Sequence, residues 1–342
     1  MNANATTSAA DVPGADARPK KKGKLRQYSG LVFGLLLLAA VIYFALHISE
    51  GKEFLTLIRN AKPGWLVAGV VYQVLTYFAS GAIWWIVVKR FNVNISLGEL
   101  SALSLAKLSL EKIIPAGGFG GSLLLIRSVE GRGAPESVAA ATLLVDVISI
   151  YAARAITIVV SVAVIWYYQG IHWVIVLVCV VFVLFAGAIL GGIYWLTGIN
   201  PRQIPRWVRK IPAIGPVMKS ISEAPPEAME SRSLFWEATG LQVLIIVLDA
   251  ATLDAMLRSL GHAAPVLATF ASFSMAGAAA MLSLIPGGLG AFEGVSILML
   301  GLLKVPVAAG LAATLMLRVF VLWLPMIPGF FILKHESKHL VE

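Results

Sequence analysis

Long apolar runs dominate this sequence of 342 residues. Six of them approach or exceed the roughly 20 residues that an α-helix needs to cross the hydrocarbon core of a bilayer. They cover residues 30–48, 65–88, 137–165, 173–196, 234–257 and 307–333. Only 13% of the residues are charged, whereas soluble domains have about a quarter. The sequence therefore predicts an all-α, polytopic membrane protein with about six full transmembrane helices.

A motif of proline followed by glycines occurs twice, as IPAGGFG at 114–120 and as IPGGLG at 285–290. The positions of Pro115 and Pro286 differ by half the length of the chain. This spacing predicts that one ancestral unit was duplicated. Proline and glycine interrupt helices, and interrupted backbone at membrane depth needs protein or a water-filled cavity around it. Each motif is therefore predicted to break a re-entrant helix pair, giving two such pairs besides the full crossings.

Basic residues indicate which side of the membrane each loop occupies. They cluster at 20–26 before the first run, follow the second run at Lys89 and Arg90, and recur through the loop 198–233. Because cytoplasmic loops are enriched in lysine and arginine, both termini are predicted to be cytoplasmic. The run 30–48 is then a retained helix, with a cleaved signal peptide as the alternative. With this orientation the two halves have inverted topology, an arrangement found in many transporters.

These signals divide the chain into five expected segments. They are a disordered basic tail (1–29), a first transmembrane repeat (30–197), a cytoplasmic basic linker (198–233), a second transmembrane repeat (234–333) and a cytoplasmic tail (334–342). Several prolines in the linker prevent it from forming one long helix.

Five ionisable side chains interrupt the apolar runs: Asp146, Arg154, Asp249, Asp254 and Arg318. Such residues usually face the interior of the bundle or a cavity, because a charge in lipid is costly. Asp146 and Arg318 occupy the same repeat position, since 318 − 146 = 172, and a two-fold axis could bring them together. One hypothesis is a structural ion pair. The other is that Arg318, with Arg127 or Arg154, neutralises a phosphate group.

The glycines of the two motifs also have two interpretations. They could allow close helix packing, as small residues do in membranes. Alternatively, they could form a turn whose N–H groups bind an anion at the start of a helix. Glu293 follows shortly after Gly290, at a position where it could cap the resumed helix, with a headgroup contact as the less favoured role.

Several classes of function find no support in the sequence. It contains no Walker loop, no HExxH, no Gly-x-Ser-x-Gly and no pair of cysteines, so motifs for ATP hydrolysis or metal-dependent hydrolysis are missing. The net charge of +9 comes with basic residues that flank apolar runs, which fits a bilayer better than nucleic acid. The sequence favours a transporter over an enzyme and predicts no cofactor, no metal and no nucleic-acid partner.

The first motif with Arg127 downstream, and the run PGGLGAFE followed by Arg318 and by Trp323-Leu324-Pro325, resemble the lysylphosphatidylglycerol synthase transmembrane region, a flippase-like integral membrane family. The resemblance covers roughly residues 30–333. It implies a functional core of Pro115, Gly117, Gly118, Gly120, Arg127, Pro286, Gly287, Gly288, Gly290, Glu293 and Arg318, with Asp146 where an acidic residue is common. Arg154 joins this set as a charge within an apolar run.

The resemblance implies that the protein moves a phospholipid or lipid-linked headgroup between leaflets of the bacterial cytoplasmic (inner) membrane. The two-part synthases of this family carry a separate soluble synthase domain that this sequence does not contain, so the resemblance favours transport over synthase activity. One alternative is an enzyme, or a membrane subunit, that modifies lipid headgroups in an aminoacyl-phospholipid, hopanoid or polyprenyl-linked glycan pathway. It would use Glu111 or Glu293 as a base. Another alternative is a non-transporting envelope scaffold. The expected partners are the lipid and a separately encoded lipid-modifying enzyme.

Overall fold

The computed structural model describes residues 58–113, 122–169, 224–283 and 285–339, with a few further residues at 56 and between 180 and 192. Four helical segments of this part are long and apolar enough to cross a membrane. They are α3 (Pro63–Arg90), α6 (Glu136–Gln169), α10 (Arg232–Ser259) and the run from α13 (Val307–Arg318) through η4 (Val319–Trp323) into α14 (Leu324–His339). The described residues form helices and turns without any strand, which confirms the all-α membrane class. The predicted crossing at 30–48, and most of that at 173–196, lies outside them.

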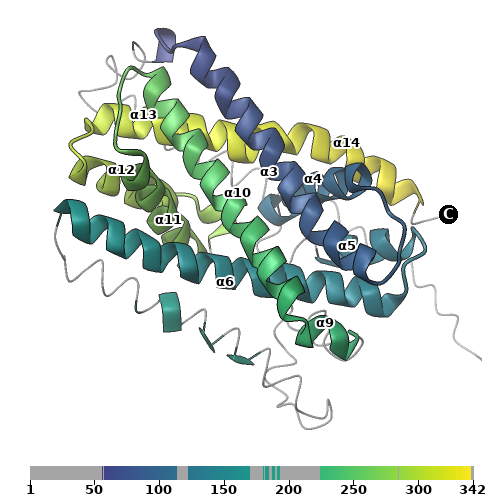
Figure 1. The fold of residues 1–342 in the computed structure, drawn as a ribbon. Helices are drawn as coiled ribbons and strands as arrows, with labels where there is room; N and C mark the ends of the chain where they lie inside the picture. The colour runs from purple at the N-terminus through teal and green to yellow at the C-terminus, as the bar shows by residue number, and fades with distance from the viewer. Residues whose placement is uncertain are drawn as a thin grey trace, which may run out of the picture.

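The long helices α3 and α10 lie side by side and run in opposite directions (Figure 1). The backbone N–H of Lys62, just before α3, donates to the carbonyl of Ser259 at the end of α10, 2.8 Å away. The helices α3 and α10 are therefore antiparallel neighbours. In contrast, α6 begins near the same end of the bundle as α10, because Val145 in its first half and Arg232 at the start of α10 line one groove. We call the two ends of the bundle the Arg90 end and the Ser259 end.

Two shorter helices connect α3 to α6 at the Arg90 end. They are α4 (Leu97–Ile113) and α5 (Ser122–Glu130). The first packs closely on α3. A Cβ atom added to Gly81 would lie 2.6 Å from the backbone nitrogen of Ser101, so glycine is what allows the two backbones to approach. The first motif, at 114–120, lies outside the described residues, so its conformation stays a prediction.

The second motif breaks a helix pair that enters the bundle from the opposite end. The broken pair consists of α11 (Val266–Leu282), a 3₁₀ turn η3 (Pro286–Gly288) and α12 (Ala291–Leu302). Ala268 near the start of α11 and Leu302 at the end of α12 line one groove with Tyr168 of α6. The chain thus enters and leaves at the Ser259 end, which confirms the predicted break at residues 285–290.

The directions of the two helix pairs are opposite. The pair α4 and α5 begins and ends beside the Arg90 end, because short turns join it to the end of α3 and the start of α6. The pair α11 and α12 begins and ends at the Ser259 end. These directions are those that an inverted arrangement requires. The duplication itself stays a prediction, since its first break is not described.

The start of α10 gives a local test of the fold. After the short helix α9 (Pro226–Glu230), Ser231 accepts a hydrogen bond from the Leu234 N–H at 3.3 Å and caps α10. We expect Ser231→Ala to lower the free energy of unfolding by about 1 kcal/mol, because an N–H of the first turn loses its partner. Unfolding of the purified protein in mixed micelles measures this. Ser233→Ala is the control, because the Ser233 hydroxyl bonds an exposed neighbour, Glu237, and a loss of equal size there would contradict the prediction.

Candidate functional site

Arg318 lies in the middle of its span, equally far from the start and from the end of the apolar segment Val307–Gly329. At a rise of about 1.5 Å per residue its depth is about 16 Å, half the thickness of a hydrocarbon core. The side chain is buried, with 5% of the residue exposed. A charge at this depth needs partners within the protein.

Those partners come from the second motif. Arg318 Nε donates to Glu293 Oε1 at 2.6 Å, Nη1 to the carbonyl of Gly287 at 2.9 Å and Nη2 to that of Gly288 at 3.2 Å. The guanidinium also lies over the ring of Phe292, 4.3 Å from its centroid. Of its five N–H donors, three are therefore bound to the chain itself. The motif presents two carbonyl oxygens to this cation, and Glu293 of the following helix α12 supplies the carboxylate of the ion pair.

Backbone geometry explains the glycines of this turn. Gly287, Gly288 and Gly290 have φ of +65°, +61° and +85°, a region that side chains with a Cβ avoid. A Cβ atom on Gly288 would also lie 2.3 Å from the Cβ atom of Ala280. The N–H of Gly290 donates to Glu293 Oε2 at 2.6 Å, which confirms the predicted cap on α12. The start of α12 is thus bound by a carboxylate of the same chain.

Asp146 does not meet Arg318. It lies in the first third of α6, about 15 Å from the Arg90 end, and 2% of it is exposed. Its carboxylate forms an ion pair with Lys107 of α4, and its Oδ1 accepts from Gln242 Nε2 of α10 at 3.3 Å. The expectation that a two-fold axis brings Asp146 and Arg318 together is therefore wrong.

The two ion pairs nevertheless have a common arrangement. Each joins a long helix to a shorter helix pair: α6 to α4 through Asp146 and Lys107, and α13 to α12 through Arg318 and Glu293. In the first ion pair the acid lies on the long helix and the base on the shorter one, and in the second ion pair the base lies on the long helix. Each charge of a long helix thus has its counter-charge on the adjacent shorter helix. Lys107 and Gln242 were missed as site residues, although a lysine in a segment too polar to face lipid was a signal for the first.

A third polar group lies at mid-depth between α3 and α10. Gln73 Nε2 donates to Asp249 Oδ1 at 3.0 Å and to Thr252 Oγ1 at 3.1 Å. The hydroxyl of Tyr77 lies 3.4 Å both from Gln73 Oε1 and from the carbonyl oxygen of Phe320 and can donate to either. Phe320 belongs to η4, the π-helical turn directly after Arg318. Such turns are frequent at functional sites, and this one leaves a carbonyl for a partner on another helix.

The remaining predicted site residues are dispersed. Arg154 lies near the middle of α6, whereas Arg127 is exposed on α5 and does not join Arg318. Asp254 pairs with Arg258 at 2.6 Å, one turn from the Ser259 end. Pro286 begins η3. Pro115, Gly117, Gly118 and Gly120 lie outside the described residues.

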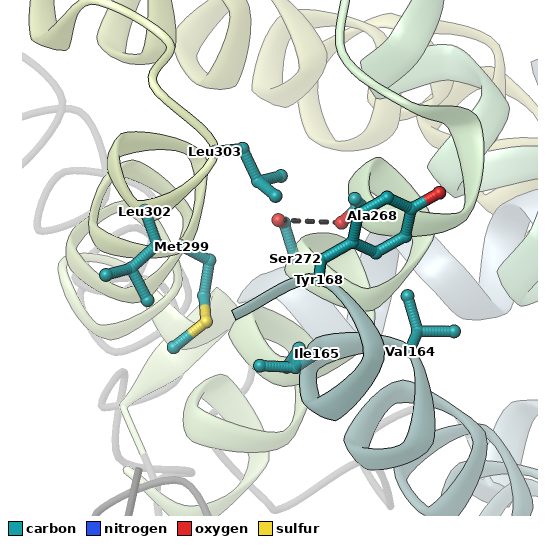
Figure 2. A pocket seen from close by; sticks show the side chains of 8 residues that line it. All are labelled: Val164, Ile165, Tyr168, Ala268, Ser272, Met299, Leu302 and Leu303. Atoms are coloured by element: carbon teal, nitrogen blue, oxygen red, sulfur yellow. Dashed lines mark hydrogen bonds between the residues drawn. The ribbon is translucent and has the colours of Figure 1, made fainter. Parts of the chain in front are cut away.

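Two grooves flank α6 at its opposite ends. The groove at the Ser259 end is narrow and lies between α6, α11 and α12. Figure 2 shows Ile165 of α6 on the side of Met299 and Tyr168 beside Ala268, while the hydroxyl of Ser272 donates to the Ala268 carbonyl at 2.9 Å. Because this hydroxyl is satisfied within α11, the lining is largely apolar. The groove at the Arg90 end is wider and lies between α6 and the segment from α9 to the start of α10.

The fold and the site define a class: a multi-pass helical membrane protein in which charged side chains meet a broken helix at the middle of the bilayer. The family model for the lysylphosphatidylglycerol synthase TM region matches residues 31–329. The chain belongs to this family, which confirms the resemblance seen in its motifs and indicates a membrane protein of lipid-related processes. A comparison with curated protein sequences gives no match.

Proposed function

We propose that the protein translocates a phospholipid or a lipid-linked headgroup between the two leaflets of the bacterial cytoplasmic membrane. The observation that carries this proposal is the set of ionisable side chains inside the bundle, away from its two ends, contributed by α4, α6, α10, α12 and α13. Buried charges in membrane helices commonly mark the path of a polar substrate. Membership of a lipid-related family supports the same interpretation.

The proposed mechanism uses the two shorter helix pairs. A headgroup crosses the apolar layer beside the buried charges, while its acyl chains remain in the bilayer or in the grooves along α6. Each ion pair joins a long helix to one of these pairs, so a rocking movement of that pair opens the polar layer toward one leaflet at a time. Each half of the chain contributes one shorter helix pair, so the headgroup can enter from either leaflet.

The proposed orientation places the Arg90 end and both termini in the cytoplasm. Lys89 and Arg90 end α3 there, and Arg232 begins α10 at the same end. Lysine and arginine are enriched on the cytoplasmic side of membrane proteins. The Ser259 end then faces outward.

Reconstitution tests the proposed function. The protein is placed in liposomes that contain phospholipids with a fluorescent acyl chain, and dithionite bleaches the label of the outer leaflet. We expect bleaching to continue beyond the outer leaflet, because translocation supplies label from the inner one. Transport no faster than in empty liposomes, across several headgroups, would overturn the proposal.

A pair of variants compares a charge inside the bundle with a charge close to the Ser259 end. Asp146→Asn removes a buried charge and is expected to slow translocation at least about tenfold, since Lys107 loses its counter-charge in a low-dielectric layer. Asp254→Asn removes a charge from the partly exposed pair at the Ser259 end and is expected to change the rate little. Melting curves of both proteins establish that each is folded before the rates are compared. Equal slowing by both variants would contradict a special role of the buried layer.

A further inference from the structure

Arg154 is a half-buried cation of α6 whose guanidinium the described residues leave incompletely bound. It lies near the middle of this helix, far from both of its ends. Its Nε and Nη1 atoms are buried and have no hydrogen-bond partner among the described residues. Arg318, by contrast, bonds one carboxylate and two carbonyls. Burying N–H groups of a guanidinium without acceptors is costly, so this position points to a ligand that supplies them.

The helix that faces Arg154 presents a glycine to it. Gly277 of α11 packs against the guanidinium, and an added Cβ atom would lie 2.5 Å from Nη1. A side chain at position 277 would therefore displace the arginine. Because α11 belongs to the broken pair, a movement of this helix away from α6 would open space directly at the unbound N–H groups.

The opposite charge comes from α10. Asp249 attracts the Arg154 guanidinium electrostatically, and its Oδ1 atom accepts a hydrogen bond from Gln73 of α3. Asp249 is thus held in place by α3, and Arg154 packs against α11. Together they present a positive and a negative charge at the same depth.

In the described part of the bundle, the charges inside the bundle are balanced. Lys107 pairs with Asp146 and Arg318 with Glu293, while Arg154 and Asp249 form the third, looser couple. A singly anionic headgroup would leave one uncompensated negative charge at the centre of the bilayer, which is unfavourable. A headgroup with one phosphate and one ammonium group keeps the layer neutral.

Building on the function proposed above, we infer that the substrate headgroup is zwitterionic. Its phosphate binds Arg154, whose planar N–H groups suit phosphate oxygens. Its ammonium group binds Asp249. Arg318 and Glu293 hold the broken helix and do not touch the lipid.

The test compares two lipids in the same liposome assay. Phosphatidylethanolamine and phosphatidylglycerol carry the same labelled acyl chain, so the ammonium group stays free and the headgroup alone differs. We expect the ethanolamine lipid to move at least about tenfold faster. Equal rates, or faster glycerol lipid, would overturn the zwitterionic inference and leave the proposed function standing. Movement of neither lipid would overturn both.

Variants assign the two charges. Asp249→Asn is expected to abolish the preference for the ethanolamine lipid and to raise the relative rate of the glycerol lipid about tenfold. Arg154→Gln is expected to slow both lipids alike. An unchanged preference in Asp249→Asn would contradict the role of this acid. Asp254→Asn is the matched control, because its charge lies near the Ser259 end.

A glycine variant covers the case in which removing a charge unfolds the protein. Gly277→Ala keeps every charge but pushes the Arg154 guanidinium aside, so both lipids are expected to slow about tenfold with the preference retained. Gly240→Ala on the exposed face of α10, where an added Cβ atom meets nothing within 4 Å, is the control and should leave the rates unchanged. Unaltered transport in Gly277→Ala would contradict binding at Arg154.

Discussion

Replacing Glu293 by methionine is expected to lower the free energy of unfolding by about 3–5 kcal/mol, because it leaves the Arg318 guanidinium buried without its counter-charge. Both side chains of the pair are 7% exposed, so water does not replace the lost carboxylate. The Gly290 N–H, which donates to Glu293 at 2.6 Å, loses its acceptor as well. Unfolding in mixed micelles with increasing denaturing detergent measures the change.

A double variant shows that the unpaired charge is the cause. Glu293→Met with Arg318→Met removes both charges and is expected to recover most of the loss, since an apolar pair of similar size replaces a buried ion pair at little cost. About 1 kcal/mol remains lost, because the N–H of Gly290 still has no carboxylate. If the double variant is less stable than Glu293→Met alone, the carbonyl contacts of Arg318 outweigh its ion pair.

Alanine at position 288 is expected to destabilise the second motif by about 2–5 kcal/mol, the sum of a backbone cost and a packing cost. Gly288 has a φ of +61°, which costs a residue with a Cβ about 1–2 kcal/mol. The new Cβ atom would overlap Ala280, 2.3 Å away, and such overpacking adds about 1–3 kcal/mol. The same unfolding assay measures this loss.

Gly294→Ala is the matched control for this variant. Gly294 lies further along the chain, inside α12, and an added Cβ atom there meets nothing within 4 Å. Because alanine favours a helix over glycine, this variant is expected to be as stable as the original protein or more so. A similar loss in both variants would show that the close contact with Ala280 is not what requires glycine.

The sequence predicts those features that depend on local composition. Long apolar runs place the crossings of α3, α6, α10 and α13, because a crossing requires about 20 apolar residues in a row. Proline followed by glycines places the break at residues 285–290, since these residues cannot continue a helix. The short distance from Gly290 to Glu293 predicts the cap on α12, because capping acts within the first turn of a helix.

Partners from distant parts of the chain could not be predicted in this way. Repeat spacing suggested that Asp146 faces Arg318, yet the two bind Lys107 and Glu293. A buried charge takes a counter-charge from the helix beside it at the same depth, and repeat spacing does not say which helix that is.

Hydropathy and helix-breaking residues act locally. The order of residues alone therefore establishes that this chain is an all-α membrane protein, where its described helices cross and where the second pair breaks. Which buried charges are satisfied depends instead on how the helices pack, because the acceptors come from other parts of the chain. Arg318 and Arg154 look alike as single charges in apolar runs. Helix packing gives Arg318 three hydrogen-bond acceptors. It leaves the Nε and Nη1 atoms of Arg154 without an acceptor among the described residues.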